Sequence, residues 1–166
     1  GGIITNIGES HLEFLESTTG VAKEKSGLFA GMNPGSNVVI PDSLSHYGLV
    51  EEAAAKAGVR ITKTAQISEK TQTGKNKFKL FEKEFETSID SPLLRQNLVL
   101  ALTLLYLEGV AVSDLQLASS SLDLSVKGRF HQIHKEDWIL IDDTYNANPS
   151  SFKSVLENLN NMYPER

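Results

Sequence analysis

The strongest constraint on the fold is a regular alternation of apolar runs and helix-like segments over the first 62 residues. The apolar runs are rich in Ile and Val and predict strands at 3–7, 37–40 and 59–62. The segments between them predict helices at 18–30 and 44–57, the second closed by Gly58 in a left-handed cap. This alternation predicts an α/β fold, in which the strands of one sheet are joined by crossover helices.

The alternation stops near Thr71, and the rest of the chain predicts other structure. Charged, alternating segments on either side of Glu82-Lys83 predict an exposed hairpin or edge strands, at 76–81 and 84–89. Two helices are expected after it, at 97–108 and 113–122. Paired strands at 130–134 and 138–142 then lead, through Asn148-Pro149-Ser150, to a helix at 151–160.

A boundary between two units is expected at 123–129. This stretch follows a serine-rich helix end and contains a Lys-Gly-Arg turn. Polar and glycine-containing linkers are typical of domain boundaries. We therefore expect a hinge here, with one unit at 1–126 and the beginning of another at 127–166.

Composition and charge argue against several classes of function. The formal net charge is -5 and no cluster of Lys or Arg stands out, which disfavours a nucleic-acid or an anionic membrane surface. The chain has no cysteine and so offers neither a disulfide nor a thiolate ligand. Its most apolar run, 98–107, has about half the length that a membrane span requires. We expect a soluble, cytoplasmic protein.

The two ends of the sequence are unusual. Gly1-Gly2-Ile3 has no initiator Met and leads directly into the first expected strand. Pro164-Glu165-Arg166 follows directly on the last expected helix. We therefore expect a fragment of a longer polypeptide, with residues missing at both ends.

Lys25 lies on the apolar side of the first expected helix. At about 100° per residue, Val21, Leu28 and Phe29 define an apolar arc that includes Lys25. A lysine in such a place commonly covers core atoms with its stem and extends its ammonium group to water. The functional alternative is a desolvated amine, whose lowered pKa makes it available for chemistry or modification.

His11 follows the first expected strand, at the edge of the sheet where α/β proteins collect ligands. A neutral imidazole there could ligate a metal or hydrogen-bond a phosphate. A surface histidine in a loop is the alternative, which its position alone favours. The placement after a strand also allows His11 and Lys25 to face one cleft.

A polar stretch, D-D-T-Y-N-A-N-P at 142–149, lies between the last expected strand and the last expected helix. Carboxylates and helix amides converge at such a place and hold a phosphate, a ribose or a metal. An Asx turn with a helix N-cap is the alternative. Both can hold at once, because Asn148 or Ser150 can cap the helix while the aspartates bind.

Two other patterns are weaker. Thr73-Gly74-Lys75-Asn76 resembles the end of a phosphate loop but lacks the upstream glycine and the hydroxyl residue after the lysine, so we expect a hairpin turn. His131 and His134 lie three residues apart on an expected strand. They would point to opposite faces and are poor joint metal ligands.

Three motifs taken together resemble the Mur ligases. They are T-N-I-G-E-S-H-L-E at 5–13, V-A-K-E-K at 21–25, and G-R-F at 128–130 followed by I-D-D-T-Y-N-A-N-P at 141–149. The last motif resembles the branch of the family that joins D-alanyl-D-alanine to UDP-N-acetylmuramoyl-tripeptide. The resemblance implies a bacterial ligase of peptidoglycan synthesis, cytoplasmic and monomeric, that uses ATP and Mg²⁺.

The resemblance also implies a parent enzyme of three domains. An N-terminal domain would hold the UDP-sugar, 1–126 would be the later part of the central ATPase domain, and 127–166 would start a Rossmann-like C-terminal domain. ATP would phosphorylate the tripeptide carboxylate, and the amine of D-alanyl-D-alanine would attack the acyl phosphate. The sequence has no Gly-Lys-Ser/Thr phosphate loop, so we expect the 166 residues alone to have no ligase activity.

Site residues follow from the resemblance by position. His11 would be a magnesium ligand, and Lys25 would be a carbamylated lysine whose added carboxylate binds a second magnesium. Asn97 would lie against the adenine. Three further residues would close on ATP from the hinge and the C-terminal domain: Arg129, Asp143 and Asn146.

The chain departs from the family pattern at two places, and other assignments stay open. Ser26-Gly27 stands where Gly-Glu is usual, and S-P-L-L at 91–94 stands where a Gly-x-His-Asn run is usual. The alternatives within the superfamily are a folylpolyglutamate-synthase-like ligase, a cyanophycin-synthetase-like ligase and a MurT-like subunit. The Y-N-A-N run at 145–148 disfavours the first. A non-catalytic remnant that acts as a binding module is the alternative of a different class.

Overall fold

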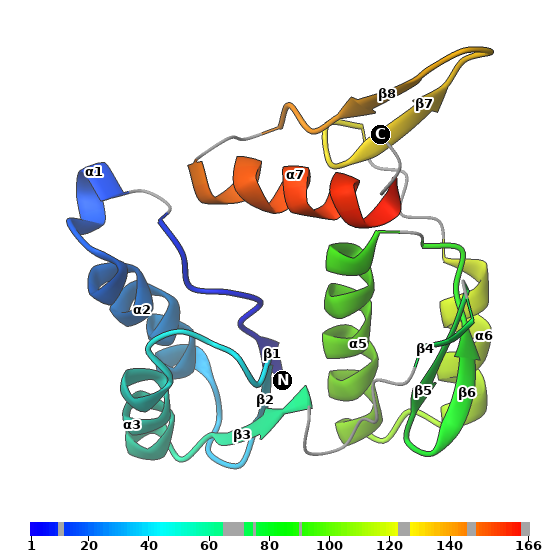
Figure 1. The fold of residues 1–166 in the computed structure, drawn as a ribbon. Helices are drawn as coiled ribbons and strands as arrows, with labels where there is room; N and C mark the ends of the chain where they lie inside the picture. Colours follow the sequence, from blue (N-terminus) through cyan, green and yellow to red (C-terminus); the bar gives the residue numbers. More distant parts are fainter. Residues whose placement is uncertain are drawn as a thin grey trace.

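The computed structural model describes residues 1–9, 12–64, 72–74, 76–89, 91–122, 127–145 and 149–163. Its first part is a parallel sheet of three strands in the order β1-β2-β3 (Figure 1). The strands are β1 (Gly2–Ile3), β2 (Asn37–Ile40) and β3 (Arg60–Lys63). The central strand β2 is apolar on both of its faces, and Val38, Val39 and Ile40 are fully buried.

Helices cover both faces of this sheet (Figure 1). On one side lie α1 (Leu12–Leu15), α2 (Thr18–Ser26), the 3₁₀ helix η1 (Gly27–Gly31) and α3 (Tyr47–Ala57). On the other side, α5 (Pro92–Leu107) packs against β1 and β2. Val21, Phe29 and Val50 join the apolar face of β2 in one buried cluster, which holds α2 and α3 to the sheet.

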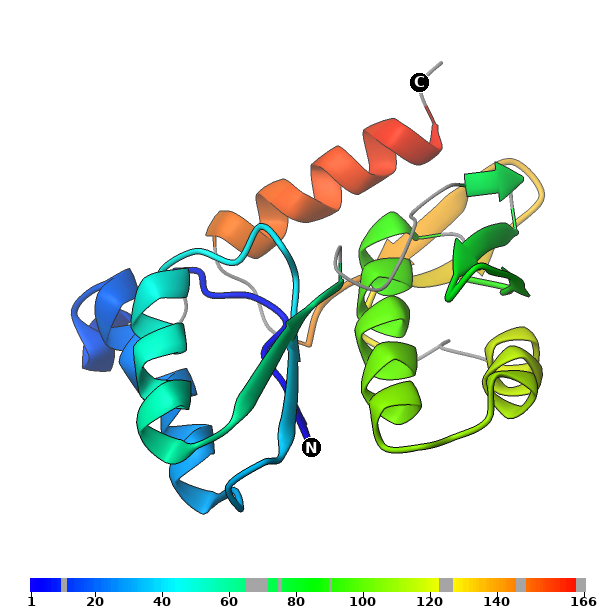
Figure 2. The same ribbon diagram turned by 90° about the horizontal axis from the view of Figure 1, so that it is seen from below.

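A small antiparallel sheet lies on the far side of α5, next to α6 (Val112–Ser121) (Figure 2). Its strands are β4 (Gln72–Gly74), β5 (Lys77–Leu80) and β6 (Lys83–Glu86). Phe78 and Phe85 face each other across β5 and β6, with ring centroids 5.6 Å apart, in a cluster that also contains Leu102 of α5 and Leu115 of α6. The cluster joins this sheet and α6 to the first part of the molecule.

The last part consists of a hairpin and a helix. Strands β7 (His131–His134) and β8 (Ile139–Asp142) pair antiparallel, and α7 (Pro149–Met162) follows them. Helix α7 lies across the N-terminal end of α5, with the hairpin on its other side (Figure 1). This arrangement brings the last part of the chain over the ends of the parallel strands.

The α/β fold expected from the sequence is confirmed, but several boundaries are wrong. The first strand was expected at 3–7 and is only Gly2–Ile3, because beyond Ile4, whose amide still donates to Val39 O at 3.2 Å, the chain leaves the sheet. Helix α2 tightens into 3₁₀ form at Gly27. Helix α3 starts at Tyr47 and not at 44, because His46 has a left-handed φ of 56°.

The largest error concerns α5, which starts at Pro92 and not at 97. The signal was present in the sequence: Ser91 is the N-cap, its side chain accepts a hydrogen bond from Leu94 N, and Pro92 opens the helix. The expected hairpin also gains a third strand, β4. Gly58 adopts the expected left-handed cap, with φ of 68°.

Within the part of the chain that the structure describes, none of the helices combines the length and the apolar character that crossing a membrane requires.

Candidate functional site

A cleft of about 230 Å³ lies where the last part of the chain meets the first. Its walls come from the loop after β1, the first turns of α5, the turn before β7 and the first turns of α7. Asn97, Arg129 and Asp143 all line it. The structure therefore brings together three of the residues that the sequence nominated from separate segments.

The loop after β1 connects the cleft to Lys25. Asn6, Gly8 and Glu9 line the cleft, and the Lys25 ammonium donates to the backbone oxygen of Asn6 at 2.7 Å and to its Oδ1 at 3.2 Å. Lys25 is half-buried, and this burial lowers its pKa. The side chain thus extends from α2 towards the end of β1, and does not enter the apolar core with Val21.

The wall from α5 begins at Ser91, which is buried and N-caps the helix. Asn97 lies six residues further along, which corresponds to about 9 Å of helix. Leu93 and Leu94 line the cleft between them. The unpaired amides at a helix N-terminus carry partial positive charge, so this wall favours an anionic or polar ligand.

The C-terminal wall is held by contacts between two segments, 127–130 and 142–145, which we call the hinge strap. Asp142 Oδ2 accepts from Gly128 N at 3.1 Å, and Asp143 Oδ1 accepts from Phe130 N at 2.8 Å. Tyr145 N donates to Gly128 O at 3.0 Å. Gly128 has φ of 79°, and a Cβ there would lie 3.3 Å from Tyr145 N. Only glycine fits this close approach without strain.

The hinge strap fixes the backbone that carries Arg129. The Arg129 guanidinium lies 4.0 Å from the centroid of the exposed Tyr145 ring, in a cation–π contact. Asp142 also accepts from Thr144 Oγ1 at 2.7 Å. This hydrogen bond, followed by those from the amides of Thr144 and Gly128, lowers the pKa of Asp142. The first aspartate of the pair therefore stabilises the turn, and the second both stabilises it and faces the cleft.

Two of the nominated residues, His11 and Asn146, lie outside the described residues. No group of three His, Cys, Asp or Glu side chains lies close enough to hold a metal ion in the described ranges. The atoms next to Lys25 that could ligate a metal are the two oxygens of Asn6, and Glu9 faces the same cleft. Oxygen atoms are the ligands that magnesium prefers, so the donor chemistry on this wall fits that ion.

Sequence reasoning missed parts of the site. Asn6 and Glu9 belong to the T-N-I-G-E-S-H-L-E motif, but only the histidine in it was singled out. Ser91 was noted as a departure from a family pattern and not as a helix cap. The hydrogen bonds of both aspartates to the turn before β7 depend on a contact between distant segments, which no local pattern predicts.

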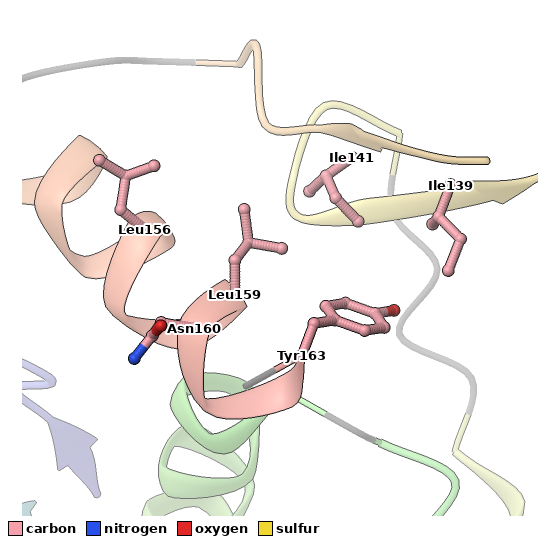
Figure 3. A pocket seen from close by; sticks show the side chains of 6 residues that line it. All are labelled: Ile139, Ile141, Leu156, Leu159, Asn160 and Tyr163. Atoms are coloured by element: carbon pink, nitrogen blue, oxygen red, sulfur yellow. The ribbon is translucent and has the colours of Figure 1, made fainter. Parts of the chain in front are cut away.

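A second cavity, of about 360 Å³, lies between β8 and α7 (Figure 3). It is lined by Ile139 and Ile141 of β8, by Leu156, Leu159 and Asn160 of α7, and by Tyr163. Its walls are mainly apolar and carry no acid–base group other than the tyrosine. This cavity is a packing groove and offers no chemistry comparable to that of the cleft.

The sequence model of the Mur ligase middle domain matches residues 1–105, which is more than half of the chain. The chain belongs to the Mur ligase family.

Relatives and solved structures agree with this assignment. The UDP-N-acetylmuramoyl-tripeptide--D-alanyl-D-alanine ligase of Haemophilus influenzae is 28% identical over 164 residues, covering 93% of this chain and 35% of the relative. A crystal structure of MurF from Acinetobacter baumannii superposes with a TM-score of 0.80 at 22% identity, over 95% of this chain and 37% of that one.

MurF ligase from Thermotoga maritima, solved in complex with ADP, gives a TM-score of 0.70 at 21% identity, over 95% of this chain and 38% of that one. The chain thus spans little more than a third of the length of the Mur ligases that it matches.

Proposed function

We propose that this chain is part of an ATP-dependent ligase of the MurF kind, which joins D-alanyl-D-alanine to UDP-N-acetylmuramoyl-tripeptide in bacterial peptidoglycan synthesis. One observation carries the proposal: Asn97, Arg129 and Asp143 face one cleft, although they come from the two units that the sequence divides at 126 and 127. Family membership and the D-D-T-Y-N-A-N-P form at 142–149 support the same choice. The parent enzyme would be cytoplasmic.

The residues of the cleft suit a nucleotide. The Arg129 guanidinium, at the same cleft as the N-terminal end of α5, favours phosphate oxygens. The Asn97 amide can both donate to and accept from the edge of a purine. The Asp143 carboxylate, oriented by Phe130 N, can accept from a ribose hydroxyl. Asn146 is proposed as a further contact to ATP, by its place in the same motif.

Magnesium is the metal that we propose with ATP. When bound, it would neutralise phosphate oxygens. His11 would be a ligand of one magnesium ion, and a carbamate on Lys25, beside the oxygens of Asn6, would bind a second. The lowered pKa of Lys25 supports this role, because carbamate formation requires the neutral amine.

The domain boundary proposed here lies between 126 and 127. Helix α6 packs against β6 and α5, which supports assigning 112–121 to the first unit. The hinge strap ties 127–130 to β8 and the residues after it, which we assign to the second unit. Both packings support a division at this position.

The ligase assay is the direct test. The complete polypeptide that contains this chain should form the amide bond from ATP, UDP-N-acetylmuramoyl-tripeptide and D-alanyl-D-alanine, and the 166 residues alone should not. Arg129→Ala should lower kcat/KM by about 10- to 100-fold, the effect of losing one charge-assisted hydrogen bond. The matched control is Lys135→Ala, in the exposed turn of the hairpin. Amide formation by the isolated chain, or a complete enzyme that accepts diaminopimelate or glutamate and not D-alanyl-D-alanine, would contradict the proposal.

The role of Lys25 has its own test. In ¹³C-labelled bicarbonate, the complete enzyme should show one carbamate carbon resonance that Lys25→Arg removes. Lys23→Arg, on the exposed side of the same helix, should leave the resonance in place. A resonance that survives in Lys25→Arg would assign the modification to another amine.

A further inference from the structure

One buried polar contact joins the two units beside the cleft. Asn158 of α7 donates from Nδ2 to Ser91 Oγ at 2.8 Å. Ser91 is 3% exposed and Asn158 is 5% exposed. The partners are 67 residues apart in the sequence, on opposite sides of the expected hinge. Water therefore cannot readily replace this hydrogen bond, and the geometry of the two units must be correct for it to form.

The contact lies at the end of the helix face that lines the cleft. Ser151, Ser154 and Val155 of α7 line it, and Asn158 follows at the same helical spacing of three and four residues. On the opposite side, Ser91 both lines the cleft and N-caps α5, the helix that carries Asn97. The Ser91–Asn158 contact therefore sets the spacing between α7 and the start of α5.

The polar character of this contact is not explained by stability alone. Among the described residues, no group donates to Asn158 Oδ1, although that oxygen is buried. A half-satisfied buried amide costs free energy that an apolar side chain of similar volume would not. A directional polar group in such a place favours one arrangement over others that apolar packing would tolerate.

We propose that Ser91 and Asn158 are positioning residues, whose hydrogen bond holds the second unit at one orientation over the cleft. Arg129 and Asp143 belong to that unit, so their distance from Asn97 depends on the contact. The inference goes beyond the proposed function and does not depend on it, because it concerns how α7 is held over the start of α5 and would apply to any ligand of the cleft.

The test measures the orientation directly. The chain contains no cysteine, so spin labels can be attached at Ala55→Cys on α3 and Lys153→Cys on α7, both exposed, and their separation measured by pulsed electron paramagnetic resonance. A second pair, at Ala55 and Lys79, lies within the first unit and serves as the reference. The distance is measured without nucleotide, so its value does not depend on whether the protein has ligase activity.

Asn158→Leu keeps the branched shape and the number of heavy atoms of the side chain and removes the donor. It should broaden the distance distribution between the units and shift it to longer values, without changing the reference pair. Asn160→Leu, an exposed position on the same helix, should change neither. An unchanged distribution in a folded Asn158→Leu variant, or equal broadening in Asn160→Leu, would overturn the proposal.

Ser91 provides an independent variant in case Asn158→Leu does not fold. Ser91→Ala removes the acceptor and should broaden the distribution, whereas Ser91→Thr retains the hydroxyl, the helix cap and the narrow distribution. The double variant Ser91→Ala with Asn158→Leu should be no broader than either single one, because both remove the same contact. Additive broadening would mean that the two residues act separately, and would also overturn the proposal.

Discussion

Strands β2 and β8 have similar sequences but different surroundings. Both contain three consecutive apolar residues, V-V-I at 38–40 and I-L-I at 139–141. The three in β2 are completely buried between α5 on one face and α2 and α3 on the other. In β8, Leu140 is 48% exposed, and only the side of Ile139 and Ile141 faces a helix. An apolar strand thus predicts burial on both faces, but the layers around it decide whether burial occurs.

The two walls of the cleft differ in the same way: one belongs to a well-packed part of the molecule and the other to a lightly packed part. Asn97 belongs to α5, which packs against the buried sheet. Arg129 and Asp143 belong to the part with β7, β8 and α7, which we propose as a second unit; its described residues bury few apolar side chains, and the hinge strap ties its segments together. Substitutions of equal chemistry should therefore have unequal effects in the two units.

The largest effect is expected for Phe29→Ala in the first unit. Phe29 is 2% exposed within the cluster that holds α2 and η1 to the sheet, so the variant should lose about 3–5 kcal/mol of unfolding free energy. Urea denaturation followed by circular dichroism measures the loss. Phe14→Ala is the matched control, because Phe14 is 81% exposed. Equal losses in both variants would show that the first unit is not packed as described.

Gly128→Ala should have a smaller effect, confined to the second unit. The left-handed φ and the approach to Tyr145 N together should cost about 1–2 kcal/mol. The fluorescence of Trp138, the single tryptophan of the chain, follows unfolding of this unit. Gly109→Ala is the control for backbone strain alone, since its φ is 91° and, apart from its chain neighbours, none of the described residues comes within 4 Å of its Cβ position. The comparison fails if Gly109→Ala matches or exceeds Gly128→Ala.

Asp142→Asn should change how the stability of the second unit depends on pH. The pKa of Asp142 is lower in the folded state, so its contribution is present above the unfolded value, about 3.9, and is lost as the pH falls through the folded value. The variant should be less stable than the wild type at pH 7, and the two should converge in acid. Asp137→Asn removes the same charge from the same hairpin and should not cause this pH-dependent loss of stability. Parallel curves for the wild type and Asp142→Asn would exclude the proposed linkage.

The smallest effect is expected for Leu140→Ala. On the open face of β8 it should change the unfolding free energy by about 0.5 kcal/mol or less. Leu80→Ala, also on a strand but completely buried, should lose about 3–5 kcal/mol. The two variants form a matched pair for urea denaturation. A large loss in Leu140→Ala would show that the outer face of β8 is covered in solution, and the contrast with β2 would then no longer hold.

The sequence predicted several elements well, because local signals set them. The apolar run at 37–40 and the glycine at 58 mark elements of the parallel part, and the alternating charges around β5 and β6 mark the antiparallel sheet. The sequence-based prediction failed at two places where the backbone is unusual. His46 takes a left-handed conformation that no helix-start rule anticipates. Strand β1 is shorter than expected because the residues after it leave the sheet towards the cleft.

The candidate site was predicted less completely. Lys25 and the D-D-T-Y run were found as patterns, but their contacts were not. Three contacts depend on how distant segments pack: Lys25 with Asn6, Asp143 with Phe130 N, and Asn158 with Ser91. The roles of His11, Lys25, Asn97, Arg129, Asp143 and Asn146 in binding ATP and magnesium remain predictions, which the experiments above address.

The hinge strap also affects how mutational data on this site should be interpreted. Because Asp142 and Asp143 hold Gly128 and Phe130, the segment that presents Arg129 and the segment that follows β8 turn as one body. If 127–166 forms a second unit, as proposed, its rotation should therefore carry both segments together. In a scan of single substitutions, changes at Gly128, Asp142 and Asp143 should lower activity in the same way as a change at Arg129. A loss of activity at Asp143 would then report displacement of the arginine as well as any contact of its own with a ligand.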